Sequence, residues 1–201
     1  MDITPLIYLK KGKLIVEREE YRLPFNEILE QVDKDGNIYV LDTDGIEKNK
    51  PNLCLYQKLS KSHDLWVDTG PRVLGDTVDV IMAGATNITI RTNLWHGGLD
   101  VSSIREITEN KIYAGVGLKS QGDRNTEIFS FYDVDGLVVF DGEKQVERDF
   151  KYGSFLKDLC IKHEVYIYER DPKNIIYWKN LGAKGLLVDI GKIKEFKKNE
   201  F

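Results

Sequence analysis

The chain contains an internal repeat of about half its length. Residues 27–36 read EILEQVDKDG and residues 127–136 read EIFSFYDVDG, so five of the ten aligned positions are identical. A second pair follows in the same order: a Pro-containing turn with basic residues at 69–72 and again at 170–173, and a Gly-Ala step at 84–85 and again at 182–183. A duplication on this scale constrains architecture before function, because each half must supply an equivalent structural unit.

Length and composition predict one globular domain over residues 1–201. The 201 residues can bury one sizeable core, and contents of 41% hydrophobic and 31% charged residues are ordinary. The net charge of −4 comes without a basic stripe, which argues against a duplex nucleic-acid surface. Cys54 and Cys160 are too few for a disulfide framework, and no segment reads as a signal peptide or a membrane span. We therefore expect a cytoplasmic protein with neither a membrane nor a nucleic-acid partner.

Apolar runs with the length of strands alternate with stretches of helical periodicity. Helical spacing of apolar residues falls in 25–32, 78–85, 101–107, 155–160 and 174–181. The eight strand candidates are Ile3 to Leu9, Ile38 to Leu41, Leu65 to Val67, Ile88 to Ile90, Ile112 to Leu118, Leu137 to Phe140, Val165 to Tyr168 and Leu186 to Val188. Several are continuously apolar, as in a parallel sheet that is covered on both faces.

Eight strand–helix units predict an α/β fold, a closed TIM (β/α)8 barrel built from two half-barrels at approximately 1–100 and 101–201. Barrels of this kind usually need ~250 residues, so a chain of 201 must have shortened outer helices, with little room for helix in 53–62 and 120–135. The alternative is an open doubly wound sheet.

A charged residue follows nearly every predicted strand. In a parallel barrel these positions meet at the carboxyl-terminal mouth, where the active sites of such folds lie. The simpler alternative is that polar residues follow strands only because the chain there becomes exposed to solvent. The residues are Asp42, Asp68, Arg91, Lys119, Asp141, Glu169 with Arg170, and Asp189.

The predicted phosphate-binding residues are Gly70, Arg72, Arg91, Thr92 and Arg170. Gly70 beside Arg72 offers backbone N–H groups and a bidentate donor to an anion. Glu169 and Asp171 flank Arg170, so we expect an anion to prefer the first site. The histidines and cysteines have no metal-ligand spacing, and we expect neither a metal nor a cofactor.

Motifs along nearly the whole chain resemble the HisA/HisF histidine-biosynthesis barrels, which are sugar-phosphate isomerases and cyclases. The first half carries the specific ones, and NLGAKGLLV at 180–188 is the best piece of the second. The first-half motifs are ITPLIYLKKGKLI at 3–15, LPFNE at 23–27, YVLDTDG at 39–45 followed by Asn52, VDTGPR at 67–72 and AGATNITIRT at 83–92.

The resemblance implies two half-barrels and a pair of catalytic Asp residues at the ends of the first and fifth strands. In this chain those positions are Tyr8 and Lys119. A phenol and an ammonium group have ordinary pKa values near 10, so they cannot act as two carboxylates at neutral pH.

Three functions are open on the sequence alone. The first is a divergent activity on a small phosphorylated metabolite, with Lys119 as a Schiff-base lysine and Tyr8 as a proton donor. The second is a non-catalytic binding or regulatory barrel. The third is the isomerase of the family, with Asp42, Asp68 or Asp141 replacing the missing carboxylates. The predicted catalytic set is therefore Lys119, Tyr8, Asp42 and Asp141, whereas the ligand, any partner subunit and the oligomeric state stay open.

Overall fold

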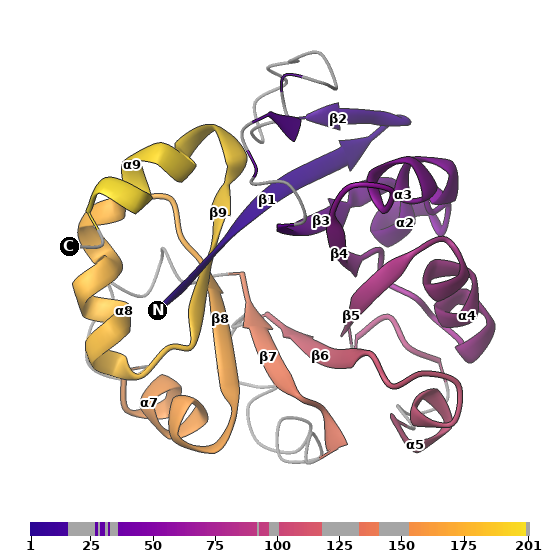
Figure 1. The fold of residues 1–201 in the computed structure, drawn as a ribbon. Helices are drawn as coiled ribbons and strands as arrows, with labels where there is room; N and C mark the ends of the chain where they lie inside the picture. Colours follow the sequence, from indigo (N-terminus) through magenta and orange to yellow (C-terminus); the bar gives the residue numbers. More distant parts are fainter. Residues whose placement is uncertain are drawn as a thin grey trace.

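A computed structural model describes residues 1–15, 27, 29, 30, 32, 36–91, 93–96, 101–117, 133–140 and 153–199. Eight parallel strands close into a barrel, because the last strand pairs with the first as well as with its predecessor. In order around the barrel they are β1 (Asp2–Lys10), β3 (Asn37–Asp42), β4 (Asp64–Asp68), β5 (Ala85–Arg91), β6 (Lys111–Val116), β7 (Gly136–Val139), β8 (Glu164–Tyr168) and β9 (Gly185–Asp189). The fold is the predicted TIM barrel (Figure 1).

Short helices cover the outside of the barrel, with α2 to α5 on one side and α7 to α9 on the other (Figure 1). The longest of those described, α7, has 10 residues. Of the two segments expected to leave little room for helix, 53–62 holds only the 7-residue α3, and 120–135 falls largely outside the described residues. The helices are α2 (Thr43–Lys48), α3 (Leu53–Leu59), α4 (Leu74–Met82), α5 (Val101–Arg105), α7 (Gly153–Lys162), α8 (Ile175–Leu181) and α9 (Ile193–Lys198), with 3-10 turns η2 (Pro172–Asn174) and η3 (Ile190–Lys192).

Sequence periodicity located α4, α5, α7 and α8, and missed α2. The helix expected over residues 25–32 falls largely outside the described residues. Gly182 ends α8 as its C-cap in the left-handed conformation, with φ of 95°, which glycine adopts without steric cost.

A short strand that the sequence did not reveal, β2 (Lys13–Ile15), runs antiparallel to the end of β1. The turn between them is Lys11-Gly12, with φ of 52° and 68°, the conformation of a tight two-residue hairpin. Strand β1 pairs with β9 only as far as Leu6, and β2 then pairs with β1 at Tyr8 to Lys10. The hairpin therefore raises the barrel wall at the carboxyl-terminal mouth.

Two apolar clusters fill the molecule. One lies between the strands and the outer helices, and the other lies inside the barrel. Inward-facing positions carry the second cluster, because side chains alternate along each strand. Its buried members are Leu6, Tyr8, Ile15, Tyr39, Leu41, Trp66, Tyr113, Val138, Tyr166, Tyr168 and Leu187. The barrel is thus packed rather than hollow, with an unusual share of aromatic residues.

Candidate functional site

The strand-end residues that the structure describes do lie at one end of the barrel. Asp42, Asp68, Arg91 and Asp189 are the last residues of β3, β4, β5 and β9, and Glu169 follows β8. Because the strands are parallel, these ends share the carboxyl-terminal mouth. Lys119, Asp141 and Thr92 fall outside the described residues, so their roles stay predictions.

Asp42, predicted as catalytic, is fully buried and serves the local structure. Its Oδ1 accepts hydrogen bonds from the N–H groups of Asp44 (3.0 Å) and Gly45 (3.2 Å), which caps α2. The backbone and side chain of Asn52 donate at 2.7 and 2.9 Å, and the Tyr56 hydroxyl donates a fifth bond. A carboxylate with five protein donors has no lone pair left for a substrate. The geometry therefore removes Asp42 from the catalytic set.

Glu169 is also buried and turned away from the barrel axis. Its Oε1 accepts from the N–H groups of Arg170 (2.7 Å) and Asp171 (2.9 Å), and its Oε2 accepts from Asn174 Nδ2 (3.0 Å) and Trp178 Nε1 (2.6 Å). Asp171 in turn caps η2. The Glu169 carboxylate thus accepts four hydrogen bonds on the outer side of the barrel. The expectation that it repels an anion at Arg170 is not supported.

Arg72, predicted to bind phosphate, is bound to the end of α2. Its guanidinium donates to the carbonyl oxygens of Gly45 (3.2 Å), Ile46 (2.9 Å) and Gly70 (3.2 Å) and to Asn49 Oδ1 (2.8 Å). The Ile46 carbonyl is one of the last carbonyls of α2, which lack a donor within the helix, whereas the Gly45 carbonyl also accepts the Asn49 N–H at 2.9 Å. Arg72 therefore acts as a helix cap, and its donors are not directed at the mouth.

Gly70 is needed where it lies, but for packing. Its φ is 63°, and a Cβ there would lie 2.7 Å from the Leu94 side chain and 3.2 Å from the Ile46 Cα. The turn after β4 is closed by these neighbours and forms no cradle for an anion. The predicted first-half phosphate site is not supported at Gly70 and Arg72.

Asp68, which is buried, and Arg91, which is partly exposed, form an ion pair that faces into the mouth. Arg91 Nε lies 3.0 Å from both carboxylate oxygens of Asp68, and one terminal nitrogen lies 2.8 Å from Oδ2. The Tyr39 hydroxyl donates to the same Oδ2 at 3.1 Å. The guanidinium lies over the Phe140 ring, 5.0 Å from its centroid. With its side chain 24% exposed, Arg91 presents a held cation to the mouth.

Tyr8 belongs to a second buried network on the opposite wall. Its hydroxyl donates to the Tyr168 hydroxyl at 2.9 Å, and Tyr168 donates to Asp189 Oδ2 at 2.9 Å. Burial, followed by the charge of Asp189, raises the pKa of both tyrosines well above the ordinary 10. Both phenols are therefore protonated at neutral pH, and Tyr8 is no base by itself.

Arg170 and Lys192 bring positive charge to the same wall. Arg170 Nε lies 4.0 Å from Asp189 Oδ2, and the Arg170 side chain is 37% exposed. Lys192, in η3 after β9, donates from Nζ to the Arg170 carbonyl oxygen at 3.3 Å. The sequence analysis singled out Arg170 and missed Lys192. The available signal was Asp-Ile-Gly-Lys at 189–192, directly after the last strand.

The described side chains hold no group of three His, Cys, Asp or Glu arranged to bind a metal ion. Among the described helices none is long and apolar enough to cross a membrane.

Comparison with known proteins places the fold but not the family. No family model matches the chain, and no curated protein matches it. Among solved structures the barrel is similar to 3-hexulose-6-phosphate synthase from Salmonella typhimurium, with a TM-score of 0.66 over 99% of this chain and 98% of that one. The two sequences are 13% identical, so the likeness supports the TIM barrel alone. These comparisons do not show membership of the HisA/HisF family.

Proposed function

We propose that this barrel binds a small phosphorylated metabolite at its carboxyl-terminal mouth, with Arg170 and Lys192 as the anion-binding side chains. The carrying observation is that Arg170 and Lys192 follow the last two parallel strands, β8 and β9, and that the Lys192 ammonium donates to the Arg170 carbonyl oxygen at 3.3 Å. TIM barrels commonly bind phosphate with the loops that follow these two strands. Arg170 supplies a planar fork for two phosphate oxygens, and Lys192 supplies a point charge.

The similar solved barrel supports a phosphorylated ligand, because it is named as a synthase of 3-hexulose 6-phosphate. The sequence resemblance to isomerases and cyclases that act on sugar phosphates supports the same class. Arg91 lies on the facing wall, so a ligand held at Arg170 and Lys192 has a third cation within the same mouth.

We further propose proton transfer through Tyr8. The carboxylate of Asp189 accepts and cannot donate, so the Tyr168 proton is directed at Asp189 and the Tyr8 proton at Tyr168. This order leaves the Tyr8 oxygen as an acceptor. A proton that leaves the ligand moves to Tyr8 as the Tyr8 proton moves to Tyr168 and the Tyr168 proton moves to Asp189. Asp189 is then the base, and no phenolate accumulates. Lys119 and Asp141 remain predicted contributors.

Titration calorimetry with ribulose 5-phosphate and with ribulose tests the binding proposal. We expect Arg170→Ala and Lys192→Ala each to weaken binding of ribulose 5-phosphate ~10–150-fold, which corresponds to losing a charged hydrogen bond of ~1.5–3 kcal/mol. The control Lys58→Ala removes an equal charge from an exposed position on α3 and should leave binding unchanged. Equal affinity for ribulose and ribulose 5-phosphate would contradict the proposal.

Hydrogen exchange in D2O separates an enzyme from a binding protein. If the relay acts, the bound sugar phosphate exchanges a carbon-bound hydrogen, and Tyr8→Phe and Asp189→Asn lower the exchange rate more than the affinity. Binding with no exchange in the unmodified protein would favour the non-catalytic barrel.

A further inference from the structure

The described residues also border a cavity at the amino-terminal end of the barrel, opposite the mouth. Its volume is about 610 Å³, within the usual range for sites that bind small molecules. Thr4, Asn37 and Asn87 line it from β1, β3 and β5. Each of them precedes by two positions a residue whose side chain lies inside the barrel. Because side chains alternate along a strand, all three are directed inward.

These three side chains carry polar groups that the protein does not pair. Within the described part of the chain, neither the Thr4 hydroxyl nor the amides of Asn37 and Asn87 have a hydrogen-bond partner. Thr4 is only 8% exposed, and the two asparagines are half-buried. Polar groups with so little access to bulk solvent are normally paired, so water or a ligand inside the cavity must supply the partners.

The charged groups at the cavity, in contrast, already have partners. Lys111 Nζ lies 3.7 Å from one carboxylate oxygen of Glu164, and Lys184 Nζ lies 3.3 Å from the other. Asp2 accepts a hydrogen bond from a tyrosine hydroxyl at 3.0 Å, and Lys197 takes part in an interaction of its own. A charged ligand would compete with these contacts, whereas a neutral ligand leaves them intact.

The wall of the cavity toward the barrel interior is aromatic, but its rings are covered. Trp66, Tyr113 and Tyr166 are 3%, 2% and 7% exposed. They pack on one another, with the Trp66 centroid 3.9 Å from that of Tyr113 and 4.8 Å from that of Tyr166. A ligand therefore finds no ring face to stack on and must be bound by hydrogen bonds.

We propose that this cavity binds a small neutral polyol, a monosaccharide or a cyclitol. The amides of Asn37 and Asn87 each present a donor beside an acceptor, which matches two neighbouring hydroxyl groups that donate and accept in turn. The Thr4 hydroxyl adds a third contact. A compound with several hydroxyl groups satisfies all three side chains at once, and a compound with one hydroxyl does not. The site is independent of the proposed function at the mouth, where the ligand is an anion.

Calorimetry with myo-inositol and with D-glucose tests this proposal. Cyclohexanol is the reference probe, because it carries one hydroxyl on a six-membered ring. We expect at least one polyol to bind, and cyclohexanol to bind at least ~10-fold more weakly, through the loss of two or more hydrogen bonds at about fivefold each. Failure of both polyols to bind, or equal affinity for cyclohexanol, would overturn the proposal.

Variants of the three polar residues place the binding in the cavity. Asn37→Ala/Asn87→Ala should weaken polyol binding at least ~10-fold. The isosteric change Thr4→Val removes only the hydroxyl and should weaken binding about fivefold. Circular dichroism checks that each variant is folded. Unchanged affinity in folded protein of both variants would place the polyol elsewhere and overturn the proposal.

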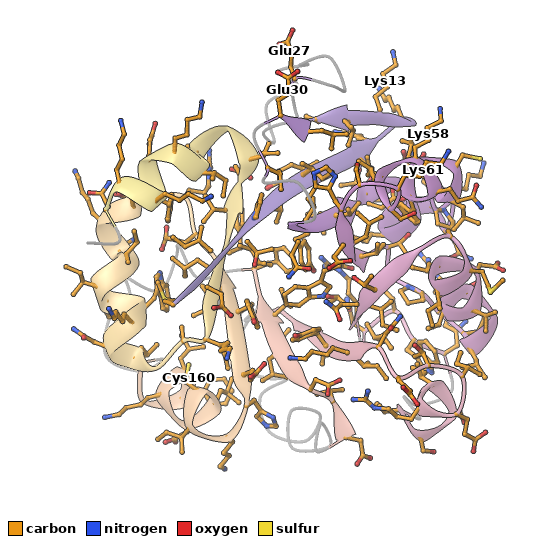
Figure 2. The ribbon with its side chains drawn as sticks, viewed as in Figure 1. Lys13, Glu27, Glu30, Lys58, Lys61 and Cys160 are labelled. Atoms are coloured by element: carbon orange, nitrogen blue, oxygen red, sulfur yellow. The ribbon has the colours of Figure 1, made fainter. Side chains whose placement is uncertain are left out.

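A matched control removes two amides from outside the cavity. Gln57 and Asn180 are exposed on α3 and α8. Gln57 directly precedes Lys58, which Figure 2 shows on the outer surface of the barrel. Gln57→Ala/Asn180→Ala should leave the affinity for the polyol unchanged. A loss equal to that of Asn37→Ala/Asn87→Ala would show that the loss is not specific to the cavity and would contradict the assignment.

Discussion

Replacement of Asp42 decides whether this strand-end carboxylate is structural or catalytic. Asp42→Ala removes the acceptor of five hydrogen bonds from a site with no exposed surface. Loss of the helix N-cap costs about 1 kcal/mol. Leaving the Tyr56 hydroxyl and the Asn52 amide without their acceptor costs about 1–3 kcal/mol each. Because neighbouring losses are not additive, we expect the free energy of unfolding to fall by about 3–4 kcal/mol.

Urea unfolding followed by circular dichroism measures this fall. Glu47→Ala removes an exposed carboxylate from the same helix, α2, and should change the free energy of unfolding by less than ~0.5 kcal/mol. Ligand affinity of the folded Asp42→Ala protein should equal that of the unmodified protein. A variant of unchanged stability that has lost affinity or hydrogen exchange would refute the structural assignment and return Asp42 to the mouth chemistry.

Three further predictions test the other local assignments. Arg72→Ala should lower the free energy of unfolding by ~1–3 kcal/mol, through the lost cap of α2, while calorimetry shows unchanged ligand affinity; a large loss of affinity would restore Arg72 as a ligand-binding residue. Burial opposes ionisation of Asp44, but hydrogen bonds from Lys48, Gly12 and Asn52 outweigh it and lower its pKa from the usual 3.8, so its stabilising effect is present above about pH 4 and is lost as the pH falls through the lowered pKa. The stability difference between the unmodified protein and Asp44→Asn should therefore shrink between pH 6 and pH 3 in urea titrations, and a constant difference would contradict this. Gly185→Ala should destabilise the protein by ~1–3 kcal/mol, because the added Cβ clashes with the Tyr166 ring. Gly75→Ala, in open space on α4, should stabilise it by up to ~1 kcal/mol. The reverse order of stabilities would show that the Tyr166 ring can move aside.

The sequence predicted the barrel because strand length and apolar content depend on local residues. All eight predicted runs overlap strands of the structure, and those positions after them that the structure describes share one end. It did not predict β2, because a three-residue strand with a Lys-Gly turn carries almost no periodicity. It also missed α2, because a helix of six residues is too short to show helical periodicity.

The roles of the strand-end residues depend on a property that the sequence analysis did not use. Side chains alternate along a strand, so Asp68 shares the inward face with Trp66, and Asp189 shares it with Leu187. Asp42 and Glu169 are displaced by one position from inward-facing Leu41 and Tyr168, and they point outward to the helices. The alternation of side chains along each strand therefore distinguishes carboxylates that can contact a ligand from those that cap helices. Counting from the aromatic residues of each strand would have made this distinction without a structure.

The two inward carboxylates end two similar chains of hydrogen bonds. Tyr8 and Tyr168 direct their protons to Asp189, which lies beside Arg170. Trp66 donates to the Thr89 hydroxyl at 2.8 Å, the Thr89 and Tyr39 hydroxyl oxygens lie 3.1 Å apart, and Tyr39 donates to Asp68, which is paired with Arg91. In both chains the O–H donors are thus directed toward a carboxylate at the carboxyl-terminal mouth.

This polarity limits what the mouth can recognise. The Tyr39 and Tyr168 protons are directed at carboxylates and the Tyr8 proton at Tyr168, so Tyr8 offers an oxygen lone pair to a ligand, and the arginines offer N–H groups. A ligand that satisfies both must carry hydroxyl donors together with an anionic group. A sugar phosphate has both on separate parts of one molecule, whereas a neutral sugar lacks the anionic group. For this reason the hydrogen-bond order inside the barrel, and not only the charge at its rim, favours the proposed class of ligand.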